Sequence, residues 1–282
     1  MKILFLLLLL GVRAHASEKE ECQIALIEES AGNSIVVSAD GKKTEVNEGL
    51  TLSLGDLLVT GNDAWVDLRL CDGTGLRVGE KAKFYFEGVG DKGDSLFSWA
   101  FSLVRGSLFA TVTGDGKGDR VKFRVRTPSA ALGVRGTEFV IDADDAPEKE
   151  TRLHTVEGEV LMGRAGDFDK LGELRGAALS ENFEPVSKEK MSRIRKGEGR
   201  AQPAADFKLG DFRKARKNFF ERKLQKKDRQ QLRGQFQAAH QKSQKIQKQR
   251  GLFERPRAKI EARMNKRRPK GAVNKIRRRK NL

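Results

Sequence analysis

The chain is poor in the side chains that most enzymes and metal sites use. Its 282 residues include three histidines, two cysteines and one tyrosine. One histidine, His15, lies near the N-terminus, and neither His154 nor His240 has a second histidine or a cysteine at metal-ligand spacing. We therefore expect no metal and no cofactor, and we interpret both residues as structural or surface histidines.

Strings that suggest catalysis lack their partner residues. Gly93-Asp94-Ser95-Leu96 spells the string of the GDSL hydrolases, but neither His154 nor His240 has the aspartate three positions earlier that those enzymes use. The glycines of residues 114–118 have the wrong spacing for a dinucleotide loop, and no Walker phosphate loop is present. The sequence thus predicts a protein that is not an enzyme, with hydrolysis through Ser95 as a remote alternative.

Long hydrophobic runs are also scarce, and the one clear run is at the N-terminus. Lys2 precedes the apolar stretch Ile3–Leu10, and Ala14-His15-Ala16 fits a cleavage site. A membrane anchor is the alternative, but so short a run cannot span an apolar core of about 30 Å. We expect residues 1–16 to be an export signal and the mature protein to be periplasmic or associated with the outer envelope.

The two cysteines, Cys22 and Cys71, both follow this signal. In an oxidising compartment such a pair is expected to form a disulfide, and two buried thiols are the alternative. We predict the Cys22–Cys71 bridge.

Acidic residues are scarce only in the last third of the chain. Residues 201–282 hold 28 Lys and Arg against 6 Asp and Glu, a net charge of +22, whereas the whole chain carries +17. So abrupt a change indicates a domain boundary. The expected organisation is a signal peptide (1–16), a β domain (17–165), a transition and linker (166–205) and a basic Gln/Lys/Arg-rich tail (206–282).

Alternating apolar and polar residues predict strands over residues 24–162. Val66, Leu68 and Leu70, for example, alternate with Asp67 and Arg69. Asp-Gly pairs at 40–41 and 72–73 are typical of hairpin turns. We predict an all-β domain, built as an antiparallel sandwich, a barrel or a β-roll, and followed by a basic, partly helical or disordered tail. We expect a break at Arg105-Gly106 that separates two strands. Ser187–Arg195 is predicted to form a short helix.

The stretch Thr127–Phe139 joins two clearly predicted strands through a corner that needs a specific backbone conformation. Pro128 fixes its own backbone, and Gly133 and Gly136 permit angles closed to other residues. Arg135 and Glu138 carry charge there, either to form a partner-binding edge or, as we favour, to close the corner. The corner residues that we single out are Thr127, Pro128, Gly133, Val134, Arg135, Gly136, Thr137, Glu138 and Phe139.

Several short sequence segments resemble, in their order and spacing, the FecR domain over about Ala25–Met162. They are Leu57-Leu58-Val59-Thr60-Gly61, Val66-Asp67-Leu68-Arg69-Leu70-Cys71-Asp72-Gly73-Thr74, Val104-Arg105-Gly106-Ser107-Leu108, Phe123-Arg124-Val125-Arg126-Thr127-Pro128, Val134-Arg135-Gly136-Thr137-Glu138-Phe139 and Val156-Glu157-Gly158-Glu159-Val160. The resemblance implies an extracytoplasmic all-β module whose founding members are membrane-spanning regulators that pass a transporter signal to a sigma factor. With no spanning helix after the signal, this chain is similar to the stand-alone exported kind.

The tail combines helical periodicity with dense positive charge. Leu209, Phe212, Ala215 and Phe219 recur at helical steps. The most basic stretch should bind polyanions through Arg267, Arg268, Lys270, Lys275, Arg277, Arg278, Arg279 and Lys280. We therefore expect a binding or scaffold protein of the envelope, in which the β domain recognises a protein or glycan and the tail contacts anionic polymers or membrane. Nucleic acid is possible but not favoured. The alternative is a signalling component that relays the state of an outer-membrane transporter to a membrane regulator.

Overall fold

The computed structural model describes residues 24–90, 98–114, 121, 123–172, 182–220, 224, 232, 234–239, 241 and 245. The chain divides into two compact units, residues 1–239 and 240–282, and the fold below is that of the first unit. Its strands are β1 (Ile24–Ala31), β2 (Ser34–Val37), β3 (Lys43–Glu45), β4 (Thr51–Ser53), β5 (Leu57–Thr60), β6 (Trp65–Arg69), β7 (Gly75–Val78), β8 (Lys83–Gly90), β9 (Ser98–Thr111), β10 (Phe123–Arg126), β11 (Ala130–Val134), β12 (Glu138–Ala143), β13 (Thr151–Glu157), β14 (Glu159–Arg164), β15 (Glu184–Ser187), β16 (Lys190–Ile194) and β17 (Ala205–Asp206).

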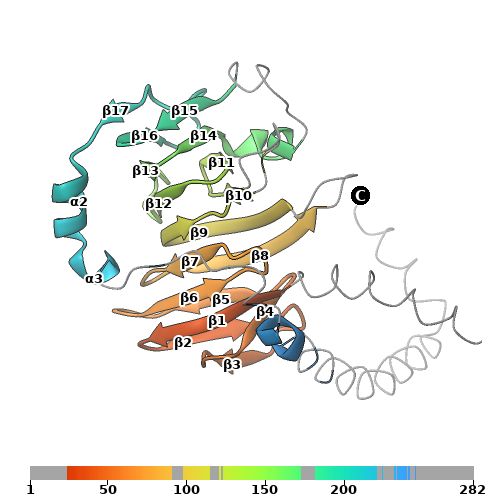
Figure 1. Cartoon of the computed structure of the whole chain (residues 1–282). Coiled ribbons are helices and arrows are strands. Elements are labelled where there is room, and N and C mark those ends of the chain that lie inside the picture. The colour runs from red at the N-terminus through yellow and green to blue at the C-terminus, as the bar shows by residue number, and fades with distance from the viewer. Residues whose placement is uncertain are drawn as a thin grey trace, which may run out of the picture. The chain divides into compact units, whose positions relative to one another are not determined.

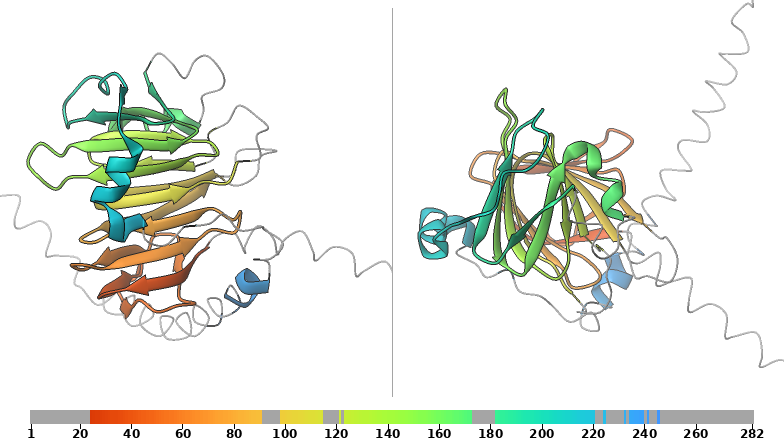
Figure 2. Two further views of the ribbon diagram at one scale, coloured as in Figure 1. Left: turned by 60° about the vertical axis from the view of Figure 1, so that its left-hand side comes forward. Right: turned by 90° about the horizontal axis from the view of Figure 1, so that it is seen from above.

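These strands form two sheets that face each other across one apolar core (Figures 1 and 2). Sheet A has the order β4-β1-β6-β7-β9-β12-β13-β16-β17. Sheet B has the order β3-β2-β5-β8-β9-β10-β11-β14-β15. The β9–β10 pair is parallel and the other described pairs are antiparallel. The predicted all-β domain is confirmed, and of the three architectures the sandwich describes it best.

Strand β9 belongs to both sheets. Its first half pairs with β8 and β10 in sheet B, and its second half pairs with β7 and β12 in sheet A. The change of sheet falls at Gly106, whose φ of 98° favours glycine. A Cβ on Gly106 would lie 2.5 Å from the Cβ of Ala82. The expected break at Arg105-Gly106 is therefore a bend inside one strand rather than a gap between two.

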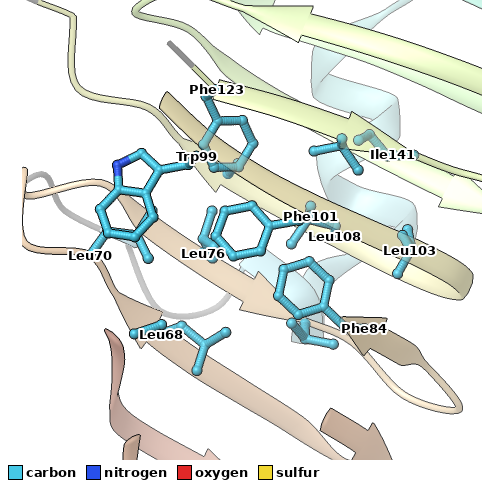
Figure 3. Packing of buried hydrophobic residues seen from close by; sticks show 14 of the residues in the cluster. Leu68, Leu70, Leu76, Phe84, Trp99, Phe101, Leu103, Leu108, Phe123 and Ile141 are labelled. Atoms are coloured by element: carbon cyan, nitrogen blue, oxygen red, sulfur yellow. The ribbon is translucent and has the colours of Figure 1, made fainter. Parts of the chain in front are cut away.

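The core between the sheets is rich in stacked aromatic rings (Figure 3). The ring centroid of Phe101 lies 5.1 Å from those of Phe84 and Phe86, and 5.3 Å from that of Phe123. All four side chains are fully buried. Since β9 lies near the middle of both sheets, this aromatic group ties the two halves of the sandwich together.

The chain beyond residue 165 continues both sheets. The 3-10 helices η1 (Ala165–Asp167) and η2 (Lys170–Gly172) come first, and β15 and β16 then extend sheets B and A. The helix predicted over Ser187–Arg195 is wrong, because a turn with Glu189 at φ 58° separates two strands there. Ser192 and Ile194 alternate inward at the period of a strand.

Short helices follow the last strand. They are α2 (Leu209–Ala215) and α3 (Lys217–Phe220), and further on Leu232, Phe236 and Ala239 bury a helical stripe in the main core. Among the described residues, we find no helix whose length and hydropathy would let it cross a membrane.

Candidate binding face on sheet A

One row of side chains crosses the outer face of sheet A. Strand register places its members side by side, while their neighbours along each strand, such as Leu76, Ile141 and Leu153, point into the core. We call these residues the outer row. From one edge to the other they are Glu29, Asp67, Arg77, Phe109, Val140, His154, Met191 and Ala205.

The charged end of the outer row is a buried ion pair. The guanidinium of Arg77 donates to both carboxylate oxygens of Asp67, at 2.7 and 2.6 Å. The two residues are only 2% and 6% exposed, and the Arg77 guanidinium also lies 4.9 Å from the ring centroid of Trp65. Burial raises the pKa of Asp67, while the hydrogen bonds and charge of Arg77 act in the opposite direction.

The apolar middle of the row is covered by a segment of the chain itself. We call residues 207–224 the cover; the structure describes its residues 207–220 and 224. Phe109 and Val140 of the row form one apolar cluster with Phe212, Phe219, Phe220 and Leu224 of the cover. Figure 2 shows α2 crossing the strands of sheet A on the side away from sheet B. Val140 is therefore 0% exposed although it points outward.

Two glycines, one in β7 and one directly after it, leave space for the cover. A Cβ on Gly79 would lie 3.0 Å from the ring of Phe219, and a Cβ on Gly75 would lie 3.0 Å from Leu224. Both approaches are closer than ordinary packing contacts allow. The sheet face is thus shaped to receive these two side chains.

Ion pairs fix the cover beside the apolar middle. Arg216 donates to both oxygens of Asp142 at 2.7 and 2.6 Å, and the hydroxyl of Ser107 donates to the same carboxylate at 2.6 Å. Arg213 lies 3.6 Å from Glu138. In addition, Arg77 donates to the backbone carbonyl of Phe219 at 2.9 Å. The cover is consequently held by aromatic packing and by charge-assisted hydrogen bonds together.

His154 lies directly under the cover. Its ring stacks on Phe212 with centroids 4.4 Å apart, and the ring of Phe207 meets it edge-on at 5.2 Å. His154 is 8% exposed, and its Nδ1 has no hydrogen-bond partner in the described part of the chain. An imidazole in this setting behaves as a flat, neutral ring.

Electrostatics keep this imidazole neutral. Burial lowers the pKa of His154 to about 4. The carboxylate of Asp142 acts in the opposite direction, whereas the cations of Arg216 and Arg152 lower the pKa further. The cover therefore docks on the neutral form of His154, and protonation of His154 opposes docking.

The corner singled out from the sequence carries the chain from sheet B to sheet A. Val134 ends β11, Gly136 turns with a φ of 63°, and Thr137 accepts a hydrogen bond from the backbone of Val112 at 2.8 Å. Val134 and Phe139 are fully buried, whereas Arg135 is exposed.

Other residues of the corner serve different local purposes. Thr127 accepts from the backbone of Ala130 at 2.8 Å and lies 2.7 Å from the hydroxyl of Thr151. Pro128 lies beside it in the same turn, and a Cβ on Gly133 would lie 2.7 Å from Leu171. Glu138 forms an ion pair with Arg213 of the cover.

Sequence reasoning missed the outer row. One signal was present in β12, where Phe139, Val140 and Ile141 are apolar in succession and therefore indicate a strand that is buried on both faces. A second signal was the concentration of phenylalanine in the otherwise basic segment 207–220. What brings the two together is the packing of the phenylalanine-rich segment on the outer face of sheet A, which cannot be read from either segment alone.

Several predicted residues lie outside the described part of the chain. They are Cys22, Ser95, His240 and the tail residues from Arg267 to Lys280. Cys71 is 5% exposed. The disulfide stays a prediction. Within the described ranges, no three or more His, Cys, Asp or Glu side chains gather as they would around a metal ion.

Comparison with known proteins gives one family match. The family model described as FecR protein matches residues 56–161. No curated protein matches the chain. Two crystal structures of a candidate anti-sigma factor from Parabacteroides distasonis ATCC 8503 are 16% and 15% identical to it, each with a TM-score of 0.38. Each match covers 53% of this chain and 59% of that protein, so the similarity spans less than two thirds of its length.

Proposed function

We propose that this chain, which carries a FecR domain over residues 56–161, is a regulatory protein that acts by binding a partner protein on the outer row of sheet A. The FecR domain supports a signalling or regulatory role. The observation that carries the choice of surface is the cover itself, because it is a peptide segment already bound there through aromatic contacts and ion pairs.

The position of the row relative to the domain supports the same proposal. Asp67, Arg77, Phe109, Val140 and His154 all lie within the FecR match, whereas the cover lies beyond it. The domain thus supplies the face, and the following segment supplies the ligand that closes it. Such an arrangement suits a regulator whose face is open or closed according to its surroundings.

The chemistry of the face favours recognition over turnover. Arg77 and Asp67 are engaged with each other, and Asp142 is engaged with the cover. The ring of His154 stacks on Phe212 and meets Phe207 edge-on, and burial lowers the pKa of His154 to about 4. These groups offer shape, apolar area and fixed charge, which are the features of a protein-binding surface.

We further propose that the protein works outside the cytoplasm. The segment of residues 1–16 has the pattern of an export signal, and the net charge of +22 beyond residue 200 suits contact with anionic polymers or membrane. In this setting the β domain would report a state of the envelope by binding or releasing its partner.

A pair of charge reversals in the cover tests the proposed face. Arg216→Glu would repel Asp142 and open the cover, whereas Lys217→Glu makes the same change of charge at the neighbouring exposed residue. Cross-linking in intact cells, followed by capture of the full chain, should recover more of a specific partner with Arg216→Glu than with Lys217→Glu. Equal recovery with both variants would overturn the assignment of the partner to this face.

A further inference from the structure

We propose that the cover is itself a segment that binds anionic membranes, and that membrane binding and docking on sheet A exclude each other. An anionic bilayer would then lift the cover and open the outer row. This inference rests on the proposed function in one respect only, namely that the opened outer row binds a partner protein. The movement of the cover from sheet A to the membrane is argued from the contacts described below.

The composition of the cover suits the surface of an anionic bilayer. Residues 207–224 hold seven Lys and Arg against two Asp and Glu, a net charge of +5. Their large apolar residues are Phe207, Leu209, Phe212, Phe219, Phe220 and Leu224. A basic segment with an apolar face rich in phenylalanine and leucine binds at the boundary of headgroups and acyl chains, and anionic lipid strengthens that binding.

The docked cover already shows a basic face to solvent. Lys208, Arg213, Lys214 and Lys217 are exposed, while Phe212, Phe219 and Phe220 are turned toward the sheet. Helix α2 has no buried residue of its own. An anionic surface would therefore meet four cations first, before any apolar contact with sheet A has been given up.

The same side chains that hold the cover would be needed by the membrane. The guanidinium of Arg216 uses both of its terminal nitrogens on Asp142, and a lipid phosphate would require the same donors. The ring of Phe220 lies 5.1 Å from that of Phe109, and Phe212 is stacked on His154. None of these rings can enter a bilayer while it is packed on the sheet, so the two states compete.

A soluble polyanion would not replace sheet A as well as a bilayer would. It can neutralise the arginines, but it leaves the released aromatic rings, which are partly buried in the closed state, in water, and that exposure is unfavourable. A bilayer accepts both the charges and the rings. We therefore assign the membrane as the second ligand, and we expect soluble polyanions to bind the exposed lysines with the cover still docked.

The outward-facing Val140 provides a direct readout. It is 0% exposed because the cover lies on it, so a Val140→Cys variant of the full chain should react with a maleimide only when the cover leaves. Ile141→Cys is the matched control, since Ile141 is also 0% exposed but belongs to the core between the sheets. The labelled position is identified by peptide mass spectrometry.

The experiment compares vesicles that contain phosphatidylglycerol with vesicles of phosphatidylcholine alone, and with heparin as a soluble polyanion. We expect phosphatidylglycerol to accelerate labelling at position 140 by about tenfold, a change of about 1.4 kcal/mol in the opening equilibrium. Labelling at position 141 should not change, and neither neutral vesicles nor heparin should accelerate labelling at position 140.

Each contrary outcome overturns the inference in a recognisable way. Vesicle binding with position 140 still protected would mean that residues beyond the cover bind the membrane. Equal acceleration at positions 140 and 141 would mean that the lipid unfolds the domain. Acceleration by heparin would mean that a soluble polyanion releases the cover without a bilayer to accept its aromatic rings. None of these results bears on the capture of a partner by Arg216→Glu, so the two proposals fail separately.

Discussion

Arg216 and Asp142 are separated by 74 residues, yet they meet through two charge-assisted hydrogen bonds of 2.7 and 2.6 Å on the outer face of sheet A. Their side chains are 30% and 16% exposed. The pair therefore lies between a solvated surface ion pair and a buried one. It joins the cover to strand β12 and makes the closed state sensitive to charge.

The coupling between these two residues can be measured. We expect a double-mutant cycle of Arg216→Ala and Asp142→Ala to give a coupling free energy of about 1–3 kcal/mol in urea unfolding, because the bonds are charged and partly desolvated. The ion pair of Lys190 and Asp206, with side chains 41% and 89% exposed, is the control and should show no measurable coupling. Equal coupling in the two pairs would contradict the assigned role of Arg216.

Acidification should release the cover through His154. Burial holds the pKa of His154 at about 4 in the closed state, against an ordinary value of 6.5. Because the closed form binds its proton less readily than the open form, closure is fully favourable above pH 6.5 and weakens as the pH falls toward 4. The full shift from 6.5 to about 4 corresponds to about 3 kcal/mol, which is the upper limit of this contribution to closure.

The corresponding measurement is the maleimide reactivity of Val140→Cys as a function of pH, corrected for the reactivity of an exposed thiol. Reactivity should rise as the pH falls from 6.5 to 4. His154→Phe keeps the flat ring but cannot be protonated, so it should abolish this dependence. A pH dependence that survives His154→Phe would assign it to another group.

Gly79 should be intolerant of a side chain because of the cover. A Cβ there would lie 3.0 Å from the ring of Phe219 and 3.4 Å from the Cβ of Ser107, so Gly79→Val should displace Phe219 and speed trypsin cleavage within residues 213–217. Gly88→Val is the control, since nothing lies within 4 Å of its position. Equal cleavage rates for the two variants would show that Gly79 is not a seat for the cover.

Removal of Arg77 should leave Asp67 buried without its charge partner. We expect Arg77→Met to destabilise the domain by about 3–5 kcal/mol at neutral pH. Burial already raises the pKa of Asp67, so the loss should shrink as the pH falls and the carboxyl takes up a proton. Asp67→Asn in the same background should recover part of the stability at neutral pH. A loss of stability that is independent of pH would point to packing instead.

The predicted Cys22–Cys71 bridge closes a loop of 49 residues, and in the chain-entropy model it contributes about 4 kcal/mol. Mass spectrometry of the exported protein should find no free thiol, and a reductant should lower the melting temperature. Two alkylated cysteines in the untreated protein would exclude the bridge.

Local patterns in the sequence were sufficient for much of the fold. The Asp72-Gly73 turn lies between β6 and β7 with Gly73 at a φ of 89°, as an Asp-Gly pair between two alternating strands indicates. The segment of β15 and β16 was misread because its exposed positions carry Lys and Glu, which also suit a helix. The inward alternation of Ser192 and Ile194 prevails there, because the core is available on one side.

The candidate site was beyond such local patterns. The residues of the outer row come from β1, β6, β7, β9, β12, β13, β16 and β17, and they become neighbours only through the register of these strands. The cover adds a further long-range pairing, in which Phe219 and Leu224 meet Gly79 and Gly75. The positive charge of the cover was evident in the sequence, but its position on sheet A follows only from these contacts.

The most direct test of the central claim, that the outer row is a binding face closed by the chain's own segment, is maleimide labelling of Val140→Cys combined with either Arg216→Glu or Lys217→Glu. We expect rapid labelling with Arg216→Glu and protection with Lys217→Glu, while Ile141→Cys stays protected in both backgrounds. Protection of position 140 in both backgrounds, or equal labelling of positions 140 and 141 with Arg216→Glu, would contradict it.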